Sequence, residues 1–349
     1  MNSSNRNEYK LVKSFFKNNL LNYIFGISAL IVVDVFQLLI PGVISNIIDS
    51  LNENLVTPGF VGKAVLKIIF LATGMFLLRF VWRLFIVRSA RKFEYETLNT
   101  LFSKIVSLTP GFFDRIKSGD IMARFTNDLK SVRMMMGPAV VVSVDAVFMT
   151  GLTIYFMGTK VDWKLTSSVL VPLFSLIPLA RYFGTNIHKR FEKVQSSFSA
   201  LSGFTEEAVS GARIVKSFSV FENMDKLFSE RAKRNLIENI KVVRIWGIFG
   251  PMVQLVASSA FLLSLFIGGR MVIKGSITLG EFIAFNTYIG MLIWPMMAYG
   301  WLMNIVQRGK ASLKRLGLIL NAIPEVKEPE NPVPLKRIEE IVVKDLTYS

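Results

Sequence analysis

Residues 112–137 read FFDRIKSGDIMARFTNDLKSVRMMMG, a polar stretch flanked on both sides by sequence apolar enough to lie in a lipid bilayer. Thr109 followed by Pro110 is typical of a helix start, so we expect a short helix over PGFFDRI. The letters KSGD should break that helix, and Asp120 should cap a second one that runs back toward the bilayer. The stretch therefore predicts a helical hairpin that leaves the membrane and returns to it.

The composition places the chain in the membrane class. Of its 349 residues, 52% are hydrophobic and only 19% are charged, which is too apolar for a typical soluble protein. The chain has no cysteine, so disulfides and thiolate metal sites are excluded. A single histidine, His188, is a poor basis for a metal site, and we expect none.

Long apolar runs recur along the chain, and each is long enough to cross a hydrocarbon core of about 30 Å. They lie at roughly 20–48, 60–87, 138–158, 164–184, 245–273 and 280–306. An even number of spans puts both chain ends on the same side of the membrane. The sequence therefore predicts an all-α membrane protein with six transmembrane helices.

The distribution of basic residues predicts the orientation. Residues 1–19, 88–137, 185–244 and 308–349 hold 32 of the 41 lysines and arginines, whereas the short loops on the opposite side hold four. Cytoplasmic segments of membrane proteins carry such an excess. We expect both termini and both long loops to be cytoplasmic, and we interpret the net charge of +16 as an orientation signal rather than a nucleic-acid footprint.

Four segments divide the chain. Residues 1–19 are predicted to form an interfacial elbow helix with Val12, Phe15, Phe16 and Asn19 near one face, although an ordinary flanking segment also fits. Residues 20–320 form the six-helix domain. The Pro- and Glu-rich residues 321–337 are typical of a linker. The β-branched residues 338–349 predict the first strand of a further domain.

The second long loop repeats the plan of the first. Between Pro178 and Pro251 there is no proline, and apolar residues recur at helical spacing. Ser210 and Gly211 should break the helix, with the short segment ARIVKSF between two long arms. Over 188–210 such an arm would reach about 35 Å beyond the bilayer. Each loop therefore ends in a short cross-piece far from the membrane.

At this point the chain resembles the transmembrane half of an ABC exporter, the six-helix type with domain-swapped intracellular loops. The segments FFDRIKSGDIMARFTNDLKSVR and EEAVSGARIVKSF are similar to the first and second coupling loops of that family. The segments RKFEYETLNTLF and EFIAFNTYIGMLIWPMMAYGWLMNIVQRGKASLKRL resemble a bacterial multidrug-exporter subfamily whose members often form heterodimers. Two departures are Thr97-Leu98, where a Leu-Arg pair is usual, and Glu206, where Gln is usual.

The resemblance implies the start of an α/β ATPase domain at IVVKDLTYS, truncated before its phosphate loop, since no G-x-x-x-x-G-K-[ST] occurs. It implies ATP and Mg²⁺ as cofactors of the full-length protein and none bound by this chain alone, which leaves open whether the chain is an enzyme. It also implies several partners: a second exporter half in a homo- or heterodimer, nucleotide-binding domains, a lipid bilayer and an amphipathic drug or lipid as substrate. It implies no nucleic acid partner. The expected location is the bacterial inner membrane. The residues implied to couple to the ATPase domains are Phe112, Phe113, Asp114, Arg213, Val215 and Phe218.

Polar and polarisable residues inside the spans are candidates for a substrate cavity. An intramembrane carboxylate such as Asp34 should face a bundle interior or a wet cavity, although a helix–helix hydrogen bond is the alternative; Asp145 is a weaker case. Thioethers and indoles suit varied apolar or cationic ligands, or they simply pack against helices and lipid. The candidates are Asp34, Gln37, Met291, Trp294, Met297 and Trp301.

Three further features leave alternatives open. Arg79 and Arg83 could snorkel or pair with these carboxylates, and Pro295 could kink the last span.

The leading function is ATP-driven export by alternating access. A receptor or scaffold on the same membrane fold is an alternative, and so is an ion channel, although no selectivity element of a channel is visible.

Overall fold

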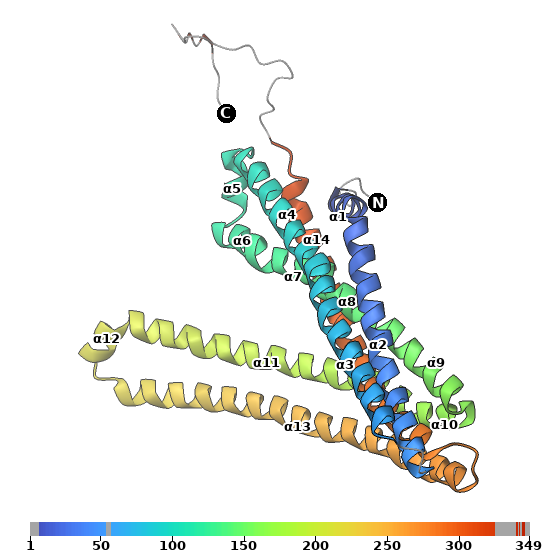
Figure 1. Ribbon diagram of the computed structural model, residues 1–349. Helices are drawn as coiled ribbons and strands as arrows, with labels where there is room; N and C mark the ends of the chain where they lie inside the picture. The colour runs from blue at the N-terminus through green and yellow to red at the C-terminus, as the bar shows by residue number, and fades with distance from the viewer. Residues whose placement is uncertain (1–6, 54–56, 325–339, 341, 343, 346–349) are drawn as a thin grey trace.

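The computed structural model describes residues 7–53, 57–324, 340, 342 and 344–345 (Figure 1). Apart from a few residues, the expected linker over 321–337 and the expected strand over 338–349 lie outside the described residues. The elements in chain order are α1 (Asn7–Asn18), α2 (Leu20–Asn52), α3 (Pro58–Trp82), η2 (Arg83–Val87), α4 (Arg88–Val106), α5 (Pro110–Arg115), α6 (Ser118–Ala123), η3 (Arg124–Asp128), α7 (Leu129–Met136), α8 (Pro138–Val144), η4 (Asp145–Met149), α9 (Thr150–Lys160), α10 (Trp163–Phe174), α11 (Leu176–Ser210), α12 (Ala212–Ser217), α13 (Phe221–Ile273) and α14 (Leu279–Leu320).

Six helical stretches of the described chain are long and apolar enough to cross a membrane, as the sequence predicted. Their bounds are Leu20–Asn52, Pro58–Val106, Ser118–Lys160, Trp163–Ser210, Phe221–Ile273 and Leu279–Leu320. Most apolar side chains of α3 point outward, and Phe70 and Phe76 are about 70% exposed. In a bilayer these outward-facing side chains would contact lipid. The helix satisfies its own backbone hydrogen bonds there, where no water is present.

The helices separate into a body and a protruding arm (Figure 1). In the body, α2 packs on α3 and α14, and α14 also contacts α7, α8 and α9. The arm consists of α11 and α13, which pack mainly on each other and lean away with α12 at their tip. The expected break at Ser210 and Gly211 and the short helix after it are both present.

The first hairpin differs from its prediction at one point. The short helix α5 begins at Pro110 as expected, but Asp120 does not cap the next helix. Ile116 and Lys117 are extended, α6 already starts at Ser118, and Asp120 lies in its first turn with its N–H donating to the carbonyl of Lys117. The extended residue that precedes a helix acts as its cap, so this role falls to Lys117.

The spans are interrupted in ways that single-sequence periodicity does not show. The fourth span breaks at Ser175, between α10 and α11. Pro178 has no N–H and leaves the carbonyl four residues earlier without a helical partner. Among the described residues, the second and third spans also contain three π-helical turns, η2, η3 and η4. Such turns often occur at functional sites.

The apolar core consists of three clusters, a small one between α8 and α14 and two larger ones at the ends of the body. We call the end that carries α1 and the last turn of α14 the terminal end, and the opposite end the loop end. One cluster at the loop end joins Leu38 to side chains from α9, α10, α13 and α14. A second cluster at the terminal end joins Tyr23 to side chains from α1, α4, α7 and α14. Along α2, residues 24–37 therefore lie between two well-packed regions.

The helix α1 packs against the body with its predicted apolar face. Phe15 and Asn19 are buried, and Phe15 makes an edge-to-face contact of 5.1 Å with Phe93 of α4. Glu8 is also buried, and its carboxylate accepts a 3.1 Å hydrogen bond from Asn321 beyond the end of α14. The amphipathic pattern of α1 is thus used for a protein contact at the terminal end.

Candidate functional site

A cavity of about 510 Å³ lies in the body between the two larger apolar clusters. It is bounded by α2, α3, α8 with η4, and α14. Its volume falls within the range of roughly 300–1,000 Å³ that is usual for small-molecule sites. The lining residues are Leu30, Val33, Asp34, Gln37, Arg79, Trp82, Val141, Asp145, Met149, Thr287, Gly290, Met291, Trp294 and Pro295.

Two carboxylates and one guanidinium line this cavity. Asp34 comes from the middle of α2, Asp145 from the π-helical turn η4, and Arg79 from α3. Arg79 Nη2 donates a 3.5 Å hydrogen bond to Gln37 Oε1. Asp34 is only 5% exposed, and its Oδ2 has no hydrogen-bond partner among the described residues. Arg79 thus lies in the same wall as the two carboxylates, but its hydrogen bond is to Gln37, and it forms no ion pair with Asp34 or Asp145 among the described residues.

Four of the six predicted cavity residues line the cavity and two do not. Asp34, Gln37, Met291 and Trp294 are in its wall. Met297 is half-buried elsewhere on α14, and Trp301 is 45% exposed. Both residues follow the lining positions at helical spacing, since Met297 is three and Trp301 seven residues after Trp294. They lie farther along α14 than Pro295, the last residue of that helix in the cavity wall.

Sequence reasoning did not assign Trp82, Met149, Thr287 or Gly290 to the site. Trp82 contributes an indole Nε1 that is buried without a hydrogen-bond partner among the described residues. The signal that could have found the residues of α14 is their spacing from Met291 and Trp294. The same signal applies to Trp82 and Met149, which lie three residues after Arg79 and four residues after Asp145.

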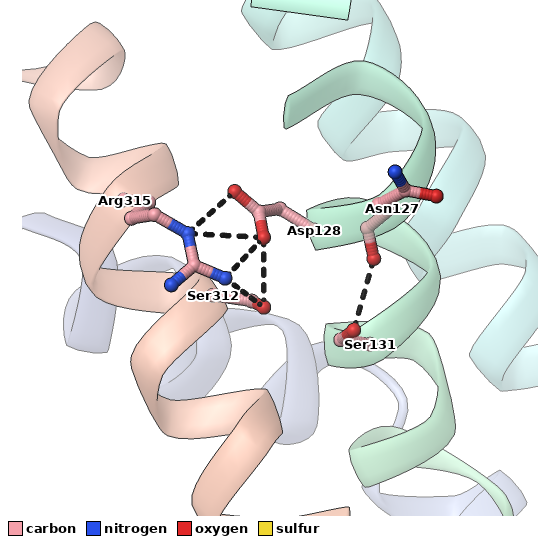
Figure 2. A network of polar contacts seen from close by, with 5 residues as sticks. All are labelled: Asn127, Asp128, Ser131, Ser312 and Arg315. Carbon is pink, nitrogen blue, oxygen red and sulfur yellow. Dashed lines mark hydrogen bonds and ion pairs between the residues drawn. The ribbon is translucent and has the colours of Figure 1, made fainter. Parts of the chain in front are cut away.

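At the terminal end a polar cluster joins η3 to α14 (Figure 2). Arg315 Nε donates to Asp128 Oδ2 at 2.9 Å, and Arg315 Nη2 donates to Asp128 Oδ1 at 2.5 Å. Ser312 Oγ adds a 2.9 Å bond to the same Oδ1. The hydrogen bond with Asp128 raises the pKa of Arg315 above its ordinary value. A neighbouring ion pair, Arg133 to Glu94 at 3.2 Å, joins α7 to α4.

At the loop end one carboxylate joins α2 to the start of α14. Asp49 Oδ1 accepts a 2.7 Å hydrogen bond from the backbone N–H of Gly280, and Asp49 Oδ2 accepts one of 2.7 Å from Thr278 Oγ1. Thr278 and Glu281 form a capping box on the same helix. A side chain at Gly280 would collide with the carbonyl of Ser45. An acidic group at a helix N-terminus is also favoured by the helix dipole.

The two short helices expected to contact ATPase domains lie at the tips of the two hairpins (Figure 1). In α5, Phe113 and Asp114 are exposed, whereas Phe112 is half-buried against the terminal-end cluster and contacts the Phe113 ring at 5.6 Å. In α12 and the residue after it, Arg213 and Phe218 are exposed and Val215 is half-buried. Ile214 is also exposed, at 63%. Both tips thus present exposed apolar side chains next to charged ones.

Comparison with known proteins places almost the whole chain in one group. Residues 23–296 match the family model described as ABC transporter transmembrane region. Over 335 residues the chain is 30% identical to the multidrug resistance-like ATP-binding protein MdlA of Escherichia coli and 31% identical to the probable multidrug resistance ABC transporter ATP-binding/permease protein YheI of Bacillus subtilis. Each match covers 96% of this chain and 57% of the relative. The chain is also 27% identical over 254 residues to the ATP-dependent lipid A-core flippase of Syntrophus aciditrophicus, covering 72% of this chain and 42% of the relative. The chain therefore spans a little over half the length of these MdlA and YheI relatives.

Proposed function

The chain belongs to the ABC transporter transmembrane family, and from this premise we propose that it forms the membrane-spanning half of an ATP-driven exporter. In this proposal the exporter moves amphipathic drugs or lipids out of the cytoplasm by alternating access. The observation that carries the proposal is the charged cavity inside the membrane-spanning body, lined by Asp34, Arg79 and Asp145. Ionisable side chains are costly in hydrocarbon and are typical of transport pathways.

The hairpin tips support a coupling role. Phe113 on α5 and Phe218 beyond α12 are exposed aromatic side chains far along the polar hairpins. Buried aromatic side chains are favoured anchors of protein interfaces, so we assign Phe112, Phe113 and Asp114 to a contact with one ATPase domain. We assign Arg213, Val215 and Phe218 to a contact with the ATPase domain of the opposite half, because the arm of α11 and α13 leans away from its own body.

The partners and cofactors belong to the assembled transporter. We propose a second exporter half, nucleotide-binding domains and a lipid bilayer as partners, with both termini on the cytoplasmic side of a bacterial inner membrane. The relatives in E. coli and B. subtilis are named as ATP-binding proteins, and we assign ATP and Mg²⁺ to the ATPase domains. The described part of this chain offers no group of three or more acidic or histidine side chains that could hold a metal ion.

The decisive experiment is reconstitution of the assembled transporter in proteoliposomes. We expect ATP-dependent movement of an amphipathic fluorescent drug or a labelled lipid, and ATPase activity that rises with the transported compound. A receptor or scaffold would bind ligands without ATP-dependent movement, and a channel would pass ions without ATP. Either of those results, in place of ATP-driven movement, would overturn the proposal.

A further inference from the structure

We propose that the cavity takes a single organic cation that carries an N–H donor, a protonated amine, and that Asp34 is the residue that recognises it. The inference deepens the proposed export function and rests on it. It begins from the hydrogen-bonding state of Asp34, which lies in the cavity wall and is 5% exposed. Its Oδ2 lacks a partner among the described residues. A buried carboxylate without donors is costly, so the occupant of the cavity is the group that can supply them.

The other polar residues of the cavity do not supply that donor. Arg79 is the positively charged residue of the wall, and its Nη2 is directed to the amide oxygen of Gln37 at 3.5 Å. Asp145 is a second acceptor rather than a donor when ionised. The hydroxyl of Thr287 comes from α14, where it already donates to the carbonyl of Ile283 at 3.0 Å. Gln37 and Trp82 also carry N–H groups, but neither donates to Asp34 in the described structure. A ligand in the cavity is therefore the donor assigned to Asp34.

The charged residues of the cavity wall determine which net charge the ligand should carry. Asp34 and Asp145 carry two negative charges when ionised, and Arg79 balances one of them. One cation completes the balance, whereas a second one would be repelled by Arg79 at short range in a medium of low dielectric constant. An anionic headgroup would meet two carboxylates for one guanidinium. The cavity therefore favours a monocation over a dication and over an anion.

The rest of the wall fits the apolar part of such a molecule. Trp82 and Trp294 offer aromatic faces, and Met149 and Met291 offer flexible thioethers. Aromatic faces attract any organic cation, including a quaternary ammonium group. A quaternary group has no N–H, however, and cannot satisfy Asp34. The comparison of an amine with its quaternary derivative thus isolates the contribution of the carboxylate from that of the indoles.

The test uses the assembled transporter in lipid nanodiscs and three matched probes. The probes are a dansyl-labelled dimethylalkylamine, its trimethylammonium derivative and the uncharged amide of equal length. At pH 7 the first two carry the same charge, and they differ by one N–H. We expect the amine to bind about tenfold more tightly than the quaternary probe, the ratio expected for one charge-assisted hydrogen bond. The amide should bind more weakly still.

Four variants separate recognition from folding. Asp34→Asn should remove the preference for the amine while leaving binding of the amide unchanged, and Asp34→Glu should restore part of the preference. Glu222→Gln, at an exposed position on α13, is the matched control and should change nothing. Arg79→Gln should raise the affinity for a diamine probe relative to the monoamine, because the second cation is no longer repelled.

Each outcome decides one of the two proposals. Equal binding of the amine and the quaternary probe, or a preference that survives Asp34→Asn in folded protein, overturns the assignment of Asp34. Tighter binding of an anionic lipid probe than of the amine overturns it as well. In these cases ATP-driven movement of other compounds would leave the export function standing. Loss of all ATP-driven movement in the wild type would instead remove the export function on which the inference rests.

Discussion

The contact between Asp128 and Arg315 should be the strongest polar tie at the terminal end of the body, and a double-mutant cycle can measure it. Asp128 is nearly buried, with 9% of its side chain exposed, whereas the Arg315 side chain is 52% exposed. Replacing Arg315 by Met would leave the carboxylate with one hydroxyl donor, Ser312. The Met side chain would occupy the place of the aliphatic part of the arginine side chain, so the packing changes little.

The expected loss in free energy of unfolding lies between the values known for exposed and for buried ion pairs. Exposed ion pairs contribute about 0–1 kcal/mol, and removal of one partner from a buried pair costs about 3–5 kcal/mol. With one partner buried and the other half exposed, we expect Arg315→Met to lower the free energy of unfolding by about 2–3 kcal/mol. Asp128→Asn should cost less, about 1–2 kcal/mol, because the amide oxygen still accepts one hydrogen bond. The coupling energy should be about 1.5 kcal/mol or more.

The assay is equilibrium unfolding of the chain in mixed micelles, titrated with SDS and followed by helical circular dichroism. Arg91→Met is the control, since Arg91 is 62% exposed in a local pair with Glu94 and should cost no more than about 0.5 kcal/mol. Because Asp128 is shielded, added salt should change the coupling little. The raised pKa of Arg315 also means that this stabilisation persists through neutral and mildly alkaline pH and is lost only when the pH passes the raised value. Additive single effects, with a coupling below about 0.5 kcal/mol, would refute the assignment.

Three further changes test other parts of the molecule. Phe113→Ala in the assembled transporter should leave basal ATPase activity intact but reduce transport and its stimulation by substrate, as expected for an interface anchor worth about 2 kcal/mol; Phe76→Ala, on the outer face of α3, is the control, and wild-type transport by the first variant would contradict the coupling role. Asp49→Ala should lower the free energy of unfolding by about 1–3 kcal/mol through loss of the cap on α14, whereas Ser50→Ala should have little effect in the same SDS titration; equal losses would argue against the cap. Phe15→Ala should cost about 3–5 kcal/mol and expose α1 to limited proteolysis, and unchanged protection of α1 would show that its docking does not depend on that ring.

The features that the sequence could predict are those set by local periodicity and length. Six spans follow from apolar runs long enough to cross a bilayer, and the breaks near Gly211 and within KSGD follow from glycine and polar residues that weaken a helix. The apolar face of α1 was also predictable, because it depends on helical spacing within a few turns. The position of the cap at Asp120 was wrong because several polar residues in KSGD can begin a helix, and the local signal does not choose among them.

The features that the sequence could not predict depend on how distant segments meet. Asp128 and Arg315 are 187 residues apart and each lies in a polar segment where charges are common. Asp49 and Gly280 are 231 residues apart. Met297 and Trp301 look as suitable for a cavity as Trp294, yet the packing of the other helices decides how far along α14 the cavity extends, and it ends at Pro295. The pairing of distant residues and the extent of a cavity are properties of packing, and a single sequence contains no direct signal of either.

The helix α14 links the cavity to both ends of the body. Its first turn is held by Asp49 of α2, and its last turns are held by Asp128 of η3. The cavity lies between these contacts, at Gly290, Met291 and Pro295. Pro295 has no N–H, so the carbonyl of Met291 loses its helical hydrogen bond inside the cavity wall. The weakest point of the helix backbone therefore coincides with the cavity wall, and any change in the contact at one end of α14 is expected to alter the shape of the cavity before it reaches the other end.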